Sequence, residues 1–311
     1  MTAGVGDSIF SPRLSPGLND FHHMSYLVLK PGMVLSHSIE DYPEGIVVPV
    51  DKPYRWTSAD VIRKVKWMAV KHFGKKNLKV GHAGTLDPLA TGVLLVCIGK
   101  ATKLAEEFQK APKQYLAGVT FGATTASYDL EKNVDTRCPL DGVSEEALRG
   151  VLPGFIGEQE QVAPLFSAKS VDGVRVYELA RKRYKAGLPM EEPGLLQASH
   201  ITIYDLKLEA FRKESPAPVV ADNSHIATST HTSSRSASSR INVAEVPAGL
   251  PQAEILVDCS KGTYIRALAR DLGEALGSGA FLHSLRRTRN GGFAVEDALS
   301  IPDIEAVFPR N

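Results

Sequence analysis

Hydrophobic positions along the chain follow two different periods. From residue 58 to 73, apolar residues return every three or four positions, the spacing of one helical face, with Thr57 or Ser58 to cap its start and Gly74 to end it. Similar patterns predict helices at 101–111, 144–155, 174–187 and 263–277. Apolar runs and alternating patterns predict strands at 44–53, 93–99, 113–125, 198–211 and 253–262, and residues 280–307 predict a basic strand followed by a short helix. Since helices and strands are mixed without regular β–α–β repetition, the pattern favours an α+β fold.

Two stretches depart from these periods. Residues 1–43 are rich in Ser, Pro, Gly and His, and we expect an extension that is partly disordered. Residues 214–250 are dominated by Ser, Thr, Ala and Pro, and such a segment buries too little apolar surface to offset its ordering entropy. We interpret it as a flexible insertion between two strands of one domain. That domain is expected to span 44–300, followed by a tail at 301–311.

Composition narrows the class of protein. The chain has 311 residues, a formal net charge of +1 and three widely spaced cysteines, which form neither a disulfide framework nor a zinc pattern. It contains no run of about 18 apolar residues and no basic-then-apolar start typical of a signal peptide. We therefore expect a soluble cytoplasmic protein that does not enter a membrane.

Basic residues cluster although the whole chain is nearly neutral. The clusters lie at 63–79, 181–185 and 286–289. Charge runs are usually solvated faces, but three of them in a near-neutral chain favour a positive surface for phosphate backbones.

One carboxylate stands alone in a long glycine-rich and apolar stretch. Residues 81–104 read GHAGTLDPLATGVLLVCIGKATKL and hold Asp87 between Leu86 and Pro88. Leu-Asp-Pro is also a good turn, so the residues alone leave a structural role open beside a catalytic one. No phosphate-binding loop, metal-ligand spacing or G-x-S-x-G elbow is present, so the sequence predicts no metal site. Tyr264 and Arg266 open a predicted helix, where an amphipathic Tyr and a snorkelling Arg are the alternative interpretation.

Five segments, taken in order, resemble the TruB family of tRNA pseudouridine synthases. They are DKPYRWTSADVIRKVK (51–66), GHAGTLDPLATGVLLVCIGKATKL (81–104), KQYLAGVTFGATTASYD (113–129), QVAPLFSAKSVDGVRVYELAR (161–181), and SKGTYIRALARDLGEALG with AFLHSLRRTRNGGF (260–293). The resemblance implies the pseudouridine synthase fold, with a mixed, mainly antiparallel sheet, flanking helices and a central RNA-binding cleft. It also implies an isomerase that converts uridine to pseudouridine at position 55, in the TΨC loop of tRNA, after flipping the base.

The same resemblance assigns roles to residues of the site. Asp87 matches the family's catalytic nucleophile, and Arg266 matches the arginine that pairs with it. Tyr115 matches a tyrosine that stacks on the target base, Tyr264 a tyrosine beside the base that is a candidate for proton transfer, and Leu285 an apolar wall of the uracil pocket. These assignments involve neither a cofactor nor a metal.

The resemblance also predicts contacts with RNA. Lys52 and the basic helix that contains Arg63, Lys64 and Lys66 are expected to meet phosphates, and His82 is expected near the flipped-out nucleotides. The expected partner is the T arm of tRNA. We expect a monomer with no obligate protein partner.

The chain departs from the family pattern at three points. Arg55 stands where the first motif has glycine, Phe166 stands where tyrosine is usual, and Lys169 follows at a spacing one residue shorter. The sequence stops about 18 residues after GGF, so no full C-terminal PUA domain is expected. Three alternatives remain at this stage: an RNA-binding or RNA-folding protein without catalysis, a guide-RNA-dependent ribosomal RNA pseudouridine synthase, and a metal-dependent nuclease.

Overall fold

The computed structural model describes residues 26–167, 170–171, 174–188, 196–215, 241 and 243–309. Most of the predicted extension and the middle of the predicted insertion therefore lie outside the described residues. No helix among the described ranges is long and apolar enough to span a membrane.

One large sheet organises the described part of the chain. Its main path runs in the order β1 (Leu27–Val28), β2 (Ile46–Lys52), β4 (Ala90–Ile98), β13 (Ala280–Asn290), β5 (Lys113–Phe121), β12 (Gln252–Cys259), β11 (Ser199–Arg212) and β8 (Gly157–Gln161). Two further strands join it, β3 (Val80–Ala83) beside β4 and β14 (Phe293–Ala294) beside β13. Only β1–β2 and β13–β4 are parallel pairs in this sheet, so the predicted mixed, mainly antiparallel α+β architecture is confirmed.

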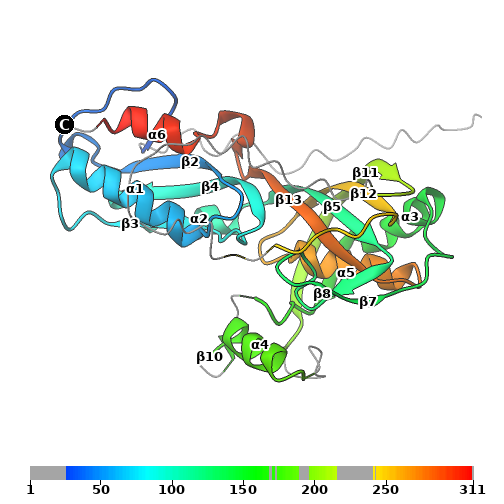
Figure 1. Cartoon of the computed structure of the whole chain (residues 1–311). Coiled ribbons are helices and arrows are strands. Elements are labelled where there is room, and N and C mark those ends of the chain that lie inside the picture. The colour runs from blue at the N-terminus through cyan, green and yellow to red at the C-terminus, as the bar shows by residue number, and fades with distance from the viewer. Residues whose placement is uncertain are drawn as a thin grey trace, which may run out of the picture.

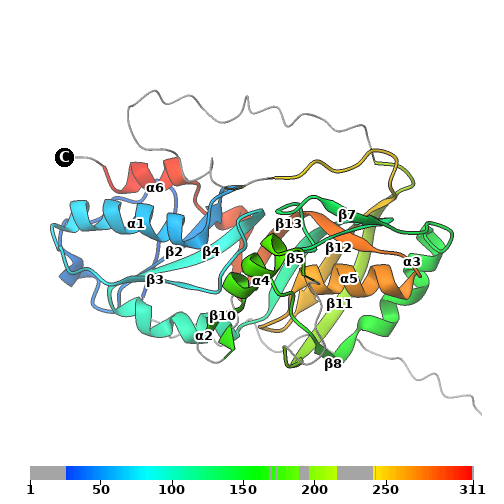
Figure 2. The same ribbon diagram turned by 60° about the horizontal axis from the view of Figure 1, so that its bottom comes forward.

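The molecule has two halves, each with its own group of helices, and β13 joins them (Figure 1). The first half holds α1 (Ser58–Phe73), α2 (Ala105–Lys110) and α6 (Ile301–Val307) around β2, β3 and β4. The second holds α3 (Glu145–Val151) and α5 (Ile265–Ala275). A further helix, α4 (Val176–Lys185), lies apart from the sheet, below the junction of the halves in Figure 1 and in front of it in Figure 2.

The first half is a sandwich in which β2 and β4 carry apolar side chains on both faces. Val48, Val50 and Leu94 belong to the main core together with the apolar face of α1. Their neighbours Val47 and Leu95 point to the opposite face, where they pack with Phe108 of α2. Alternation along the strands thus places α1 and α2 on opposite sides of the sheet.

Most predicted elements form where the patterns indicate. The helix predicted from Thr57 to Gly74 is α1, with Thr57 as N-cap in a capping box with Asp60 and Gly74 in the left-handed conformation at its end. The helix predicted at 101–111 begins instead as the 3-10 segment η2 (Gly99–Leu104), and only its second half is α2. The strand predicted at 113–125 breaks at Gly122, which has a φ of 89°.

Several short elements are not apparent from the sequence pattern. The strands β3 and β8 were not predicted, nor was the hairpin of β6 (Ala123–Thr125) and β7 (Val134–Arg137). A second small hairpin pairs β9 (Ser170–Val171) with β10 (Val174–Arg175). Besides η2, the described residues include the 3-10 turns η1 (Ile39–Asp41), η3 (Leu152–Phe155) and η6 (Val295–Asp297).

The described end of the N-terminal extension belongs to the first half. Residues 27–28 form β1, and Leu29, Leu35 and Ile39 are buried in the main core. The predicted C-terminal tail likewise contains α6, which buries Ile304 and Val307.

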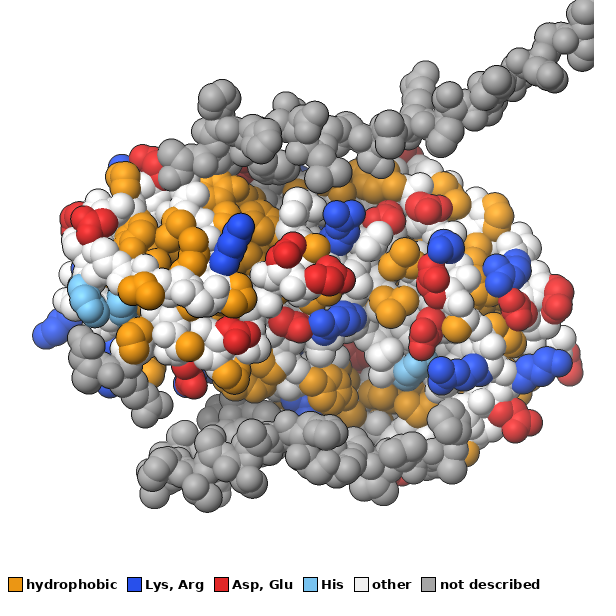
Figure 3. Space-filling model, turned by 90° about the horizontal axis from the view of Figure 1, so that it is seen from above, with side chains coloured by type: hydrophobic (Ala, Val, Ile, Leu, Met, Phe, Trp, Pro, Cys, Tyr) orange, Lys and Arg blue, Asp and Glu red, His pale blue; other side chains and the backbone are white. Residues whose placement is uncertain are grey.

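Figure 3 shows the face of the molecule seen from above. On this face the described acidic and basic side chains are interspersed rather than gathered into a patch of one sign.

Candidate active site

Asp87 lies in the turn that joins β3 to β4. Neighbouring elements hold this turn from both sides of the aspartate. The Ser58 hydroxyl, at the start of α1, lies 3.0 Å from both the backbone nitrogen and the carbonyl oxygen of Leu86. The backbone N–H of Ala90 donates to the Asp87 carbonyl at 3.1 Å, which closes the turn. Its carboxylate is therefore presented by a fixed loop at the centre of the sheet.

Arg266 pairs with this carboxylate from the first turn of α5. Its guanidinium nitrogen lies 2.9 Å from Asp87 Oδ2, and the Arg266 side chain is only 5 % exposed while that of Asp87 is 41 % exposed. Two backbone carbonyls, those of Ser127 and Phe166, accept further hydrogen bonds from it at 3.1 and 2.8 Å. Such a fixed charge-assisted pair orients the carboxylate toward the open side.

A second carboxylate, Asp129, lies on the inner side of Arg266. Its Oδ2 is 3.7 Å from Arg266 Nε, and its Oδ1 accepts hydrogen bonds from the Ser127 hydroxyl at 2.6 Å and the Glu131 N–H at 2.9 Å. Burial raises the pKa of Asp129, and Arg266 opposes that shift. Burial alone would lower the pKa of Arg266, but Asp87 and Asp129 together raise it. The guanidinium therefore stays charged inside the protein because two acids face it.

A cavity of about 510 Å³ opens in front of Asp87. Its lining brings together Asp87, Tyr115, Tyr264, Arg266 and Leu285, which come from four separate parts of the sequence. Figure 2 shows the junction of the two halves, where these elements meet. All five residues that the sequence assigns to catalysis and base binding thus line one cavity.

The two tyrosines are held differently. Tyr115 on β5 is 9 % exposed, and burial raises its pKa, with Arg287 opposing the shift. Tyr264 precedes α5, and the buried side chain of Gln161 holds its backbone by accepting from its N–H at 2.8 Å and donating to its carbonyl at 3.2 Å. Burial also raises the pKa of Tyr264. Both phenols are therefore neutral hydrogen-bonding groups at neutral pH.

Cations that the sequence analysis did not single out complete the lining. Arg287 is 1 % exposed and donates to the carbonyls of Val93 at 2.7 Å and Gly84 at 3.2 Å. Lys113 donates to three carbonyls at the end of α2, and burial lowers its pKa to about 8. Lys261 is exposed at the rim. The basic run 286–289 was recognised in the sequence, but its pattern did not reveal that Arg287 points inward.

The expected phosphate contact of Lys52 does not fit its position. Its side chain is completely buried, and Nζ donates to the carbonyls of Pro53, Trp56 and Pro88 at 3.0, 2.6 and 3.2 Å. Burial lowers the pKa of Lys52 to about 7, with the charge of Asp87 opposing the shift. Lys52 thus supports the catalytic turn from within, because its Nζ donates to three backbone carbonyls, one of them in that turn.

The other predicted RNA-binding residues lie outside the cavity lining. Arg63 is exposed on α1 and pairs with Asp60, whereas Lys64 pairs with Glu305 of α6 at 2.5 Å. Lys66 is exposed on the same helix. His82 lies on β3, where burial and Arg287 lower its pKa. Because α2, not α1, contributes to the cavity, the structure does not bring the α1 cations to Asp87.

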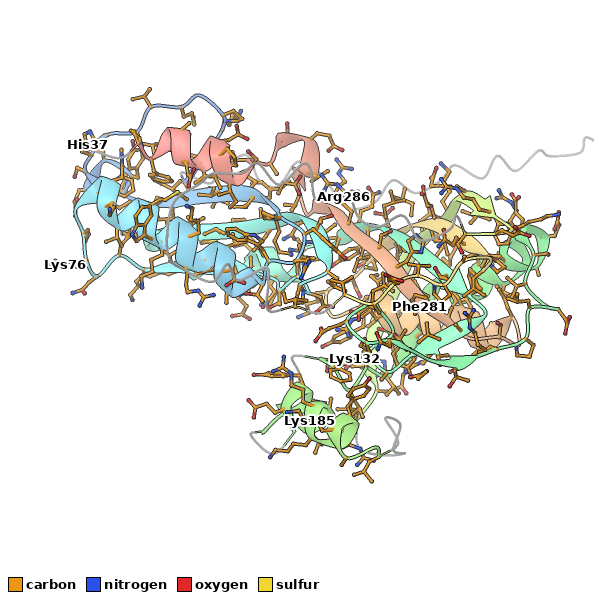
Figure 4. The ribbon with its side chains drawn as sticks, viewed as in Figure 1. His37, Lys76, Lys132, Lys185, Phe281 and Arg286 are labelled. Atoms are coloured by element: carbon orange, nitrogen blue, oxygen red, sulfur yellow. The ribbon has the colours of Figure 1, made fainter. Side chains whose placement is uncertain are left out.

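The helix α4 sits beside the cavity on a small apolar base. Val176 and Ala180 of α4 pack in a cluster that also contacts Tyr264. Lys132 projects between the second half and this helix in Figure 4, with Nζ 5.1 Å from the ring centroids of both Phe166 and Tyr184. Phe166 therefore has a structural role, because its ring packs beside Lys132 and its backbone carbonyl accepts a hydrogen bond from Arg266. Lys169 lies outside the described residues.

Acidic residues do not form a metal centre in the described ranges, where no group of three or more His, Cys, Asp or Glu side chains is placed to hold an ion. The site is instead organised by one arginine between two carboxylates.

Comparison with solved structures identifies the fold. A chain of the archaeal box H/ACA sRNP Nop10–Cbf5 complex matches with a TM-score of 0.50 and 22 % identity, covering 85 % of this chain and 54 % of that one. A chain of a Cbf5–Nop10–Gar1 complex matches with a TM-score of 0.51 at the same identity, covering 84 % and 54 %. This chain thus spans about half the length of those chains, and the likeness concerns the fold alone. This chain therefore shares the fold of the matched chains in those complexes.

Comparison of sequences identifies the family. A model described as TruB family pseudouridylate synthase (N terminal domain) matches residues 71–232, and one described as tRNA pseudouridylate synthase B C-terminal domain matches residues 266–310. Proteins named tRNA pseudouridine synthase B are similar over most of their length. The one from Phocaeicola vulgatus is 43 % identical over 84 % of this chain and 92 % of its own, and that from Deinococcus radiodurans is 36 % identical over 85 % and 83 %. The chain belongs to the TruB family of pseudouridylate synthases.

Proposed function

We propose that this TruB-family enzyme isomerises uridine 55, in the TΨC loop of tRNA, to pseudouridine with Asp87 as the nucleophile. The observation that carries the proposal is the 2.9 Å pair between Asp87 and the buried Arg266 at the edge of a nucleotide-sized cavity. The curated relatives named tRNA pseudouridine synthase B support tRNA as the substrate. Neither a protein partner nor a second subunit is needed for these residues to meet, so we propose that one chain acts alone in the cytoplasm.

A single nucleophilic carboxylate is enough for this reaction. Asp87 engages the nucleoside, the bond between N1 and C1′ breaks, the uracil turns within the cavity, and C5 bonds to C1′. The proton that C5 loses is matched by the one that N1 gains, so neither water nor a redox cofactor enters the balance. Hydrolysis of a glycosidic bond differs because it requires a second carboxyl group to handle a leaving group and water.

The lining offers a place for an everted base. Its volume of about 510 Å³ lies within the usual range of small-ligand sites, roughly 300–1,000 Å³. Tyr115 and Leu285 supply an aromatic ring and an aliphatic wall for the uracil, and the neutral phenol of Tyr264 stands beside it as the candidate for proton transfer. Loops suit such recognition because their bases can be splayed out of the stack.

Cations around the cavity would meet the RNA backbone. The exposed Lys261 at the rim is the first candidate, because Lys113 and Arg287 are buried and donate hydrogen bonds to backbone carbonyls of the protein. The exposed Lys66 of α1 remains a candidate for a more distant part of the tRNA. Such contacts set affinity and register rather than chemistry.

The first prediction tests the nucleophile. Purified protein is incubated with an unmodified tRNA transcript in buffer with EDTA, and pseudouridine is mapped by carbodiimide-based primer extension. We expect product at position 55 without strand scission, and we expect Asp87→Asn to abolish product while tRNA affinity stays within a few-fold. Asp141→Asn, at an exposed aspartate, is the matched control and should retain activity. Pseudouridine made by the Asp87→Asn variant would contradict the assignment, and binding without product in the unmodified enzyme would favour the non-catalytic alternative.

A further inference from the structure

Arg55 adopts a backbone conformation that arginine normally avoids. Its φ is 64°, and the only other non-glycine residue with positive φ in the described ranges is Tyr128. In this left-handed region the Cβ of an L-residue crowds the following carbonyl, so the conformation carries a cost that glycine escapes. The family motif has glycine at this position, so a strained residue here requires a compensating contact.

The backbone of Arg55 supports the catalytic turn, but it does not explain the arginine. Its N–H donates to the carbonyl of Pro88 at 3.0 Å, directly after Asp87. Lys52 Nζ binds the same oxygen at 3.2 Å. A glycine at position 55 would make the same backbone hydrogen bond without strain. The reason for an arginine must therefore lie in its side chain.

The side chain of Arg55 reaches the described end of the inserted segment. Its guanidinium donates to the carbonyl of Ile241 at 2.7 Å, across 186 positions of sequence. Its Nε is buried without a hydrogen-bond partner in the described structure. Arg55 is half-buried overall, so part of its guanidinium is withdrawn from solvent.

The segment that follows Ile241 packs against the catalytic motif itself. Its residues Val243, Ala244 and Val246 belong to an apolar cluster that also contains Leu89, two positions after Asp87, and Phe281 of β13. The N–H of Ala244 donates to the carbonyl of Leu130 at 2.7 Å. Arg55 and this cluster therefore connect Ile241 and residues 243–246 to the catalytic turn at two points, Pro88 and Leu89.

We propose that Arg55 is a positioning residue that locks Ile241 and residues 243–246 against the catalytic turn and thereby fixes the orientation of Asp87. The proposal rests on the catalytic role proposed for Asp87. It gives the end of the insertion a function that neither its composition nor the family pattern assigns. The left-handed strain at Arg55 is retained because the side chain makes the turn and the inserted segment one rigid unit.

The variant Arg55→Gly tests the contribution of the side chain separately from that of the backbone. This variant keeps the N–H that binds Pro88 and relieves the strain, so we expect a thermal midpoint close to that of the unmodified enzyme. We expect its single-turnover rate at saturating enzyme to fall about tenfold, because small misplacements of a reacting group are costly, while the Kd for tRNA transcript stays within about twofold. Arg55→Lys, with one donor centre in place of a planar fork, should be intermediate. Arg149→Ala, which removes an exposed ion pair with Glu145, is the control and should change neither quantity.

Hydrogen exchange gives a readout that does not depend on activity. In Arg55→Gly, the amides of 84–90 and of 243–246 should exchange faster together, while those of α3 stay unchanged. Unchanged rates of exchange in both segments, or an unchanged single-turnover rate, would overturn the proposal. A weaker tRNA Kd with an unchanged rate at saturation would also overturn it, since Arg55 would then be an RNA contact. If the unmodified enzyme makes no pseudouridine, the proposed function fails, and the coupled exchange still decides whether Arg55 joins the two segments.

Discussion

Arg266 holds a buried positive charge that pairs with the carboxylates of both Asp87 and Asp129. The two acids differ in what else they contact, since Asp129 is enclosed by hydrogen bonds and Asp87 faces the cavity. Removing one partner of a buried charge leaves the other exposed to the cost of desolvation. At the scale of single residues, the catalytic carboxylate therefore depends on a second acid that need not touch the substrate.

Asp129→Asn should weaken both activity and stability. The asparagine oxygen can still accept from Ser127 and Glu131, but its amide would then face Arg266 Nε and bring two donors together. We expect the single-turnover rate to fall by about ten- to a hundredfold, since Arg266 would shift relative to Asp87. The thermal midpoint should fall as well. Asp135→Asn, at an exposed aspartate of β7, is the control; equal rates and midpoints for the two variants would show that the inner acid has no such role.

Strand geometry explains which side chains could be foreseen. Ile46, Val48, Val50 and Lys52 alternate on β2, so period two already points Lys52 toward the core face. The family resemblance instead predicted a contact between Lys52 and RNA phosphates. The alternating pattern could have corrected this prediction. By contrast, no local pattern indicates β3 or β8, because β3 is a short VGHA segment and β8 is a short, polar GEQEQ segment. Their pairing with β4 and β11 is decided by tertiary contacts.

The same limit applies to the candidate site. The resemblance located Asp87, Tyr115, Tyr264, Arg266 and Leu285, because each belongs to a recognisable motif. Gln161 and Asp129 lie inside quoted motifs but have no chemical signal of their own in sequence. Gln161 acts by holding the backbone of Tyr264, and Asp129 acts by pairing with the guanidinium of Arg266. In both cases folding brings together residues more than a hundred positions apart in the sequence.

The close approach of β4 and β13 leads to a prediction about Gly92. A Cβ at Gly92 would stand 2.1 Å from the Arg287 carbonyl oxygen, and the residue has a φ of 97°. Gly92→Ala must therefore separate two strands that carry the cavity, and we expect it to lower the thermal midpoint strongly or prevent folding. Gly74→Ala is the matched control, because Gly74 has a φ of 63° but nothing within 4 Å of the added atom. It should cost only the left-handed strain, about 1–2 kcal/mol. Similar midpoints for both variants would contradict the close packing of this parallel pair.

The whole molecule places lysines in its interior to support the cavity. Lys52 and Lys113 each bind three backbone carbonyls, and each joins a helix or turn to the strands beneath. Burial lowers the pKa of Lys52 to about 7 and that of Lys113 to about 8, both from a usual value of 10.5. The two lysines lie on different strands, β2 and β5, so their ionisation contributes to the stability of the fold as a whole.

This arrangement predicts how stability depends on pH. Above pH 7 the folded protein releases protons from these lysines while the unfolded chain still holds them, so stability rises with pH toward 9. The rise should slow above pH 9 and reverse at about pH 10, because burial holds the pKa of Cys97 and Cys259 at about 12 while the thiols of the unfolded chain lose protons from about pH 9. We expect the thermal midpoint to increase by a few degrees between pH 7 and 9, since about 1 kcal/mol moves the midpoint of a domain of this size class by roughly 2–4 °C. Lys113→Met should reduce the rise and Lys66→Met, at an exposed lysine, should leave it intact; a midpoint that is flat or falling across this range would show that the buried lysines keep their ordinary pKa.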